Sequence, residues 1–463
     1  MNTDIFIKKS IELYKELNKN QIYYNSHHYY NKLITADPLY ISPDTYKVLL
    51  SKGKDIWKWI DEQHVFLREA FTSNNLNWFK QLLSKIFDKK SYDYLKKIAE
   101  RPLKISQILR ADLSSFPFNC HEAQLRWGIA GHLHFIDSLF NKVIPTTKNS
   151  KIINQDLAVT IQEIVHQYCK QDNEICIFLT SKKYFFETKS FVDLIKRTEM
   201  VLVKDFFNNA LEIKNNELIH KQSGKKVKLI FRRQLTLETL AKHTLGQKII
   251  ELYLDGKIKF EPDLNLITDN KLGMPIVFDA RSRDYFSNSS RELFLKTAFF
   301  SKDFSSFNSV FQTKYDNFKD FLEKTTASQR KYVFKYGGSK LSMCYGGGEV
   351  YRFDRSAKLT KRIVEAGLQK SKADNEWIIQ EMDSNRFEFR YLEGDYDNPN
   401  TCHIEKATNL PARIMIMYSN IDGKINLTHC LANFVTDHWK ARLKNSNSKK
   451  GKGAIVTSIR VKE

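Results

Sequence analysis

The segment RADLSSFPFNCHEAQLRWG, residues 110–128, has the pattern of a β-hairpin whose two strands flank a proline-containing turn. Along a strand, residues two positions apart face the same side, so Arg110 lies beside Asp112 and Glu122 lies beside Gln124. A hairpin would gather these four side chains. Carboxylate and amide oxygens suit Mg²⁺, and a neighbouring arginine can stabilise a phosphoryl oxygen. The segment therefore predicts a metal site, although an amphipathic hairpin with a polar outer face would show the same pattern.

The composition indicates a large globular protein with an anionic partner. The 463 residues are 42% hydrophobic, which is enough for two or three structural units with a sizeable core. Lysine and arginine exceed aspartate and glutamate by 74 to 53, a formal charge of +21. This excess favours a nucleotide, a nucleic acid or an acidic metabolite as a partner. A solvated basic surface without such a partner explains the charge equally well.

The cysteines and the hydropathy pattern suggest where the protein works. The six cysteines contain no C-x-x-C pair and no zinc-site spacing, so we expect reduced, structural thiols. No window approaches 18 consecutive apolar residues, and the first residues have the pattern of an amphipathic helix. We therefore expect a cytoplasmic protein with no membrane partner.

The pattern of apolar and polar residues changes several times along the chain, and these changes predict a mixed fold, α/β with α+β parts. Residues 1–102 have helical periodicity and are expected to form a cap or substrate domain. Residues 103–150 contain the hairpin and a helix, and residues 151–300 alternate strands with helices, as in a parallel α/β unit. Residues 301–442 contain strands separated by Gly, Asn and Asp turns. Residues 443–463 form a basic linker and a terminal strand.

A second candidate functional segment is KYVFKYGGSKLSMCYGGGEV, residues 331–350, in which a strand carrying Lys335 is followed by two glycine clusters. Glycines let backbone N–H groups approach a phosphate, and a strand-borne lysine adds charge to the same oxygens. The pattern suits a nucleotide lid, although a hairpin with two glycine-rich turns is an equally simple interpretation. The glycines are Gly337, Gly338, Gly346, Gly347 and Gly348.

The order of these motifs resembles the circularly permuted ATP-grasp ligases, and in particular the glutathionylspermidine synthetase synthetase-domain group. In that group, R-x-D and E-x-N metal motifs precede an α/β segment, a lysine and a lysine-glycine lid, and the same order occurs over roughly residues 105–440. The resemblance implies a circularly permuted ATP-grasp fold with a helical N-terminal region. The chain departs from the family by having Gln124 in place of Asn and Tyr336 in place of the Pro after the lid lysine.

The resemblance also implies roles for individual residues. The metal ligands would be Asp112, Glu122 and Gln124, while Arg110 would stabilise the transferred phosphoryl group. The ATP-binding residues would be Lys296, Lys335, the lid glycines, Arg413, and the adenine-side strand residues Ile379, Gln380 and Glu381. Arg232 or Arg233, at the end of a strand in the α/β unit, would face the substrate.

The function implied by the resemblance is that of an ATP-dependent carboxylate–amine ligase, with Mg²⁺ as the metal and an acyl phosphate as the intermediate. Its partners would be ATP, a carboxylate substrate and an amine acceptor, either a small molecule or a peptide, including polyanionic ones. Two alternatives remain open: a basic nucleic-acid-binding protein, and an ATP-grasp scaffold that binds nucleotide without catalysis.

Overall fold

The fold was analysed in a computed structural model. The structure describes residues 2–19, 35–102, 106–114, 120–124, 138–144, 150–152, 157–182, 185–232, 235–264, 270–338, 350–382, 387–394, 398–410, 412–435 and 454–462.

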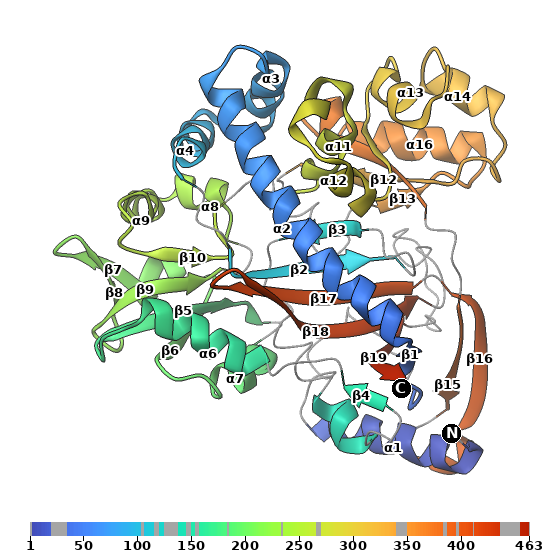
Figure 1. Cartoon of the computed structure of the whole chain (residues 1–463), viewed down its shortest axis with the longest axis horizontal. Coiled ribbons are helices and arrows are strands. Elements are labelled where there is room, and N and C mark those ends of the chain that lie inside the picture. Colours follow the sequence, from blue (N-terminus) through green and yellow to red (C-terminus); the bar gives the residue numbers. More distant parts are fainter. Residues whose placement is uncertain are drawn as a thin grey trace.

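A seven-stranded sheet lies at the centre of the molecule (Figure 1). Its order is β1-β19-β18-β17-β2-β3, with β4 beside β19; β1 runs parallel to β19, and the other pairs are antiparallel. Asp422 and Gly423 form the two-residue turn between β17 and β18, with φ of 50° and 80°, a geometry that Asp-Gly favours. The strands are β1 (Leu39–Ile41), β2 (Ile108–Leu113), β3 (Cys120–Gln124), β4 (Ser150–Ile152), β17 (Ala412–Ile421), β18 (Lys424–Val435) and β19 (Ala454–Lys462).

The long helix α2 (Pro43–Thr72) crosses the central sheet (Figure 1). Ser42 caps its N-terminus by accepting a hydrogen bond from Thr45 N, at 3.1 Å. The helix approaches the sheet closely at Gly53, where a Cβ would lie 2.9 Å from the ring of Tyr418. The Tyr418 hydroxyl donates to the carbonyl oxygen of Leu49 at 2.7 Å, which ties β17 to the helix.

The α/β unit contains the sheet β6-β5-β9-β8-β7, with β10 beside β9. Strands β5, β6, β9 and β10 are parallel, while β7 and β8 form an antiparallel extension. Every residue of β5 is buried, as expected for an apolar strand covered on both faces. The elements are α6 (Leu157–Tyr168), β5 (Glu174–Thr180), α7 (Phe185–Val192), β6 (Thr198–Leu202), a π-helix (Phe206–Ala210), β7 (Leu211–Lys214), β8 (Glu217–His220), β9 (Lys225–Phe231), α8 (Leu237–Lys242), α9 (Thr244–Leu254) and β10 (Lys259–Glu261).

A small lobe is built on the antiparallel sheet β11-β14-β12-β13. One face packs on helices through an aromatic core, in which Trp377 stacks on Phe334 with ring centroids 4.3 Å apart. The elements are β11 (Thr297–Phe299), α13 (Ser305–Phe311), α14 (Phe318–Lys324), β12 (Tyr332–Tyr336), β13 (Val350–Arg352), α16 (Ala357–Leu368), a 3₁₀-helix (Asp374–Glu376) and β14 (Trp377–Glu381).

The remaining elements join these parts. Helices α11 and α12, with the 3₁₀-helix between them, lie between α2 and the small lobe, and α1 contacts the two-stranded ribbon of β15 and β16 (Figure 1). Their bounds are α1 (Thr3–Lys19), α3 (Asn77–Ile86), α4 (Lys89–Ala99), α11 (Gly273–Phe278), the 3₁₀-helix (Ala280–Tyr285), α12 (Asn288–Leu293), β15 (Phe387–Glu393), a second 3₁₀-helix (Pro399–Thr401) and β16 (His403–Leu410).

The chain is a mixed α/β protein, as the sequence predicts. Residues 1–102 do not form a separate helical cap, because β1 extends the central sheet and α2 packs across it. The terminal strand β19 is likewise an inner strand of that sheet, between β1 and β18. The domain boundary expected at residue 300 would place β11 and β14 in different domains, although the two strands pair in the sheet of the small lobe. In the described part of the chain, no helix is long and apolar enough to cross a membrane.

Candidate functional site

Of the hairpin expected at residues 110–128, the structure describes the two paired strands, β2 and β3, while residues 115–119 and 125–128 lie outside the described residues. Its register pairs Arg110 with Gln124 and Asp112 with Glu122. Because directly opposed residues of an antiparallel pair lie on the same face, these four positions share one face of the central sheet. The β-pairing therefore brings together the four positions that the sequence marks as a metal site.

Arg413 reaches the same face from the neighbouring strand β17. The register pairs Met415 with Asp112, and Arg413 lies two residues before Met415. Arg413 Nη2 donates to Asp112 Oδ2, and Arg110 Nη2 donates to the same oxygen at 3.2 Å. Asp112 is thus buried, at 1% exposure, between one buried guanidinium and one partly exposed guanidinium.

The electrostatics of this cluster keep Asp112 ionised. Burial alone would raise the pKa of Asp112, but the charges and hydrogen bonds of Arg110 and Arg413 outweigh burial and hold the pKa at about 2. The second carboxylate oxygen, Oδ1, is buried and accepts no hydrogen bond from any residue that the structure describes. An ionised, buried oxygen without a partner is costly unless a cation binds it. The donor set therefore fits Mg²⁺, with Glu122 at the opposed register position.

Lys335 lies on the face of the small-lobe sheet opposite the aromatic core. Its ammonium donates to Gln380 Oε1 at 2.5 Å, and Gln380 Nε2 donates to Thr297 Oγ1 at 2.9 Å. These contacts link β12, β14 and β11, and both Lys335 and Gln380 are buried. The structure thus brings two of the expected ATP-binding residues together, and the contact indicates that Gln380 orients the lysine.

Lys296 and Glu381 meet at the edge of the same sheet. Glu381 Oε1 accepts from the backbone N–H of Lys296 at 2.8 Å, and Glu381 N donates to Lys296 O at 3.0 Å. The Lys296 residue is exposed. Ile379 is fully buried in the aromatic core, so its side chain faces away from Lys335, and only its backbone could meet a ligand on the lysine side.

The two described glycines of the lid segment lie in close packing. Gly337 N donates to Glu376 O at 2.6 Å, and Gly337 O accepts from Lys271 N at 2.9 Å. At Gly338 a Cβ would lie 2.5 Å from the Tyr336 hydroxyl oxygen, so a larger residue would collide there. The remaining lid glycines, Gly346, Gly347 and Gly348, lie outside the described residues.

Arg232 is placed differently from the expected substrate-facing residue. It is buried, and its guanidinium donates to the carbonyl oxygens of Pro262 at 2.6 Å, Leu235 at 3.2 Å and Asp263 at 2.5 Å. Arg232 therefore stabilises the backbone conformation around the end of β10. Arg233 lies outside the described residues.

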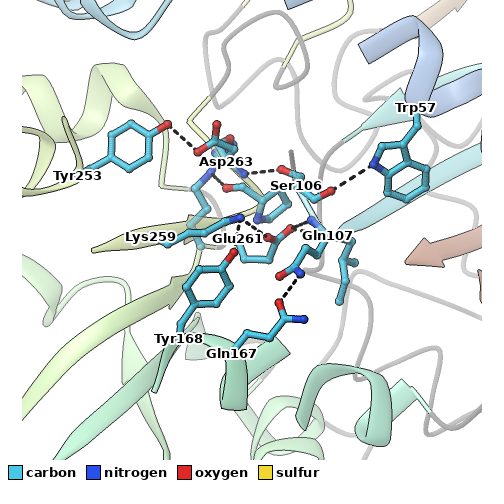
Figure 2. A network of polar contacts seen from close by, with 12 residues as sticks. Trp57, Ser106, Gln107, Gln167, Tyr168, Tyr253, Lys259, Glu261 and Asp263 are labelled. Atoms are coloured by element: carbon cyan, nitrogen blue, oxygen red, sulfur yellow. Dashed lines mark hydrogen bonds and ion pairs between the residues drawn. The ribbon is translucent and has the colours of Figure 1, made fainter. Parts of the chain in front are cut away.

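A buried polar network connects the α/β unit to the beginning of β2 (Figure 2). Glu261, in β10, is fully buried, and its Oε1 accepts from the backbone N–H groups of Gln107 at 3.0 Å and Ile108 at 3.1 Å. Lys259 lies beside it, 4.0 Å from Glu261 Oε2, and donates to the Tyr168 hydroxyl at 2.8 Å. The strand that carries Arg110 and Asp112 is therefore anchored at its start by an ionisable side chain.

The same network continues through Asp263. Its Oδ1 accepts from the Tyr253 hydroxyl at 2.6 Å, and its backbone N–H donates to Ser106 Oγ at 2.7 Å (Figure 2). The Trp57 indole donates to Ser106 O at 3.3 Å, which extends the network to α2. Sequence reasoning missed these residues; the alternation of charges in KFEPD (259–263) was the available signal, but it does not reveal burial.

Replacing Glu261 by glutamine is expected to change how stability depends on pH. Burial raises the pKa of Glu261 to about 7, against the opposing effects of Lys259 and the two N–H donors, and Asp263 adds to the rise. The folded state then binds the proton more tightly than the unfolded state, so the free energy of unfolding falls as pH rises from about 4.5 to about 7. Glutamine keeps a side-chain oxygen that can accept the two backbone hydrogen bonds, but it has no group that titrates in this pH range.

As pH rises from about 5 to about 8, the free energy of unfolding of Glu261→Gln should therefore increase relative to that of the wild type, by at most about 3 kcal/mol. Urea unfolding at both pH values measures this difference. The exposed Glu365→Gln variant serves as a control and should show no such change. If the difference in unfolding free energy between the wild type and Glu261→Gln were the same at both pH values, the conclusion that Glu261 is a buried group with a raised pKa would be wrong.

A separate group of possible metal ligands lies on the β15–β16 ribbon. The ligand atoms of Glu393, His403 and Glu405 all lie within 4.8 Å of one another, and His403 Nε2 is 3.1 Å from Glu405 Oε1. The three side chains are exposed or half-exposed. Surface carboxylates commonly gather without an ion, so this group does not by itself define a metal centre.

No protein-family model and no curated protein matches the chain. The central sheet offers an ionised Asp112 between two arginines, and the small lobe offers Lys335 oriented by Gln380. Both groups suit a phosphate-bearing ligand with a divalent cation.

Proposed function

We propose that this protein is an ATP-dependent carboxylate–amine ligase with a circularly permuted ATP-grasp fold. The observation that carries the proposal is the cluster on the central sheet, where a buried, ionised Asp112 contacts Arg110 and Arg413 and keeps one oxygen without a partner among the described residues. A buried carboxylate of this kind suits a cation bound to phosphate oxygens, and its two arginines suit the phosphates themselves.

The small lobe supports the same proposal. An antiparallel sheet carries Lys335 on the face opposite its aromatic core, and Figure 1 shows this lobe on the side of the molecule where β3 forms the edge of the central sheet. A nucleotide held between two sheets requires side chains suited to phosphate on both of them, and each of these sheets offers such side chains. Lys296 and the lid glycines would complete the binding of the phosphates.

In the proposed reaction, an oxygen of the substrate carboxylate attacks the terminal phosphorus of ATP, and the bond to ADP breaks. The amine then attacks the acyl carbon, inorganic phosphate leaves, and the amine nitrogen loses a proton to solvent. Arg110 and Lys335 offset the charge on the transferred group, and Arg413 orients it. Mg²⁺ held by Asp112 and Glu122, with Gln124 beside them, would neutralise charge on the phosphates.

The test is an ADP-release assay with Mg²⁺ and ATP over a matrix of carboxylates and amines. The proposal predicts that ADP forms only when one acid and one amine are present together, with an amide of their summed mass minus water. ADP formation that needs neither partner would argue for a simple ATPase. ATP binding without turnover across the whole matrix would favour a non-catalytic nucleotide-binding scaffold.

A further inference from the structure

A chain of hydrogen bonds runs across one face of the small-lobe sheet and ends at the ammonium of Lys335. Thr297, in β11, lies directly opposite Gln380, in β14, and Val333, which lies opposite Gln380 on its other side, is two residues before Lys335 in β12. Directly opposed residues share a face of a sheet, as do residues two apart along a strand. Thr297 and Gln380 are fully buried, and Lys335 is 7% exposed. Water therefore has little access to the bonds that join the three side chains.

The donors and acceptors of this chain fix its direction. The Thr297 hydroxyl has one hydrogen, which it donates to Leu295 O at 2.8 Å, so its oxygen is the acceptor for Gln380 Nε2, at 2.9 Å. An ammonium group only donates, so Lys335 requires the amide oxygen, and its Nζ lies 2.5 Å from Gln380 Oε1. Both ends of the chain therefore require the same orientation of the Gln380 amide, with its nitrogen toward Thr297 and its oxygen toward Lys335.

The contact with Gln380 limits the freedom of a flexible side chain without offsetting its charge. Lysine carries its ammonium on a flexible four-carbon stem, and fixing that stem before a ligand arrives lowers the entropy lost on binding. Gln380 is neutral, so it orients the ammonium but does not compete with a phosphate for its positive charge. Gln380 Nε2 also lies 3.7 Å from Met274 Sδ, which is a weak acceptor, so Thr297 makes the stronger of these two contacts to the amide nitrogen.

We propose that Thr297 is a positioning residue of the proposed ATP site: it fixes the Gln380 amide, and that amide holds the Lys335 ammonium in place for a phosphate group. The inference rests on the proposed function, because it requires Lys335 to contact ATP. Thr297 itself does not touch the nucleotide, since its hydroxyl is engaged within the lobe both as a donor and as an acceptor. Removing that hydroxyl should therefore weaken phosphate binding only through Gln380 and Lys335.

The test is isothermal titration of the full chain with Mg²⁺ and a non-hydrolysable ATP analogue. Thr297→Val keeps the shape of the side chain but removes the hydroxyl, and Thr297→Ser keeps the hydroxyl. Gln380→Met removes the amide at similar volume, and the double variant of Thr297→Val with Gln380→Met tests whether the two residues act in one chain. The matched control is Thr457→Val, in β19, which removes an equally buried hydroxyl that donates to Asp37 O at 2.7 Å.

The affinity for the analogue should fall at least about tenfold in Thr297→Val and stay within about twofold of the wild type in Thr297→Ser and Thr457→Val. The double variant should bind no more than about twofold more weakly than Gln380→Met, because the hydroxyl acts only through the amide. If circular dichroism shows that Thr297→Val does not fold, Thr297→Ala, which also lacks the hydroxyl, should show the same weakening.

Three results would overturn the role of Thr297 while leaving the ATP site in place. They are wild-type affinity in Thr297→Val, equal weakening in Thr297→Ser or Thr457→Val, and additive losses in the double variant. A wild-type protein that does not bind the analogue would instead overturn the proposed ATP site, and this inference with it.

Discussion

The variant Asp112→Asn is expected to lose ADP formation and about 3 kcal/mol of unfolding free energy at neutral pH. Asparagine keeps the volume of the side chain but removes the charge that balances Arg110 and Arg413. Because Arg413 is 41% exposed on its side chain, water offsets part of the loss, and the lower end of the range for a broken buried ion pair applies. Urea unfolding and the ADP-release assay measure the two effects.

The pH dependence provides an internal check on this prediction. The pKa of Asp112 is lowered to about 2, below the value of 3.8 for an ordinary aspartate, so its stabilising contribution is present above about pH 4 and is lost as pH falls through about 2. The difference in unfolding free energy between wild type and Asp112→Asn should therefore shrink over that acid range.

The matched control is Asp172→Asn, which removes the same charge from a fully exposed side chain paired with Arg197. It should leave both unfolding and ADP formation unchanged. If Asp112→Asn unfolded like the wild type and formed ADP at the same rate, both the buried ion cluster and its proposed role would be wrong. Circular dichroism at the assay temperature separates lost chemistry from lost fold.

The variant Lys335→Met is expected to bind a non-hydrolysable ATP analogue about 100-fold more weakly than the wild type, equivalent to about 3 kcal/mol. Methionine fills most of the space of the lysine stem but cannot donate to Gln380 or to a phosphate. Isothermal titration with Mg²⁺ present measures the affinity.

Lys331→Met is the control for this second prediction. Lys331 is exposed, directly precedes β12 and carries the same charge. Its substitution should change the affinity by less than about twofold. Equal weakening by Lys331→Met and Lys335→Met would show that net charge, rather than a defined phosphate site, governs binding.

The local parts of the fold and site could be predicted from sequence. The β2–β3 hairpin and the strand with Lys335 follow from period-two alternation and turn residues, which act over a few positions. The family resemblance gave Arg413 only as an ATP-binding residue, whereas its place beside Asp112 depends on the register of β17 against β2.

Long-range pairing and burial could not be predicted in the same way. Strands β1 and β19 come from opposite ends of the chain, and no local pattern specifies that they pair. Arg232 has the sequence context of a strand-end ligand, yet packing places it against three carbonyl groups. Glu261 has the same chemistry as any surface glutamate, and only the tertiary fold buries it at the start of β2.

The central claim is that this site activates a carboxylate as an acyl phosphate, and trapping with hydroxylamine tests it most directly. Hydroxylamine replaces the unknown amine and converts an acyl phosphate into a stable hydroxamate, whose mass identifies the acid. With ATP, Mg²⁺ and a fractionated metabolite extract, the wild type should form ADP and one hydroxamate, and Asp112→Asn should form neither. ADP and hydroxamate at no more than the Asp112→Asn background in every fraction would contradict the account.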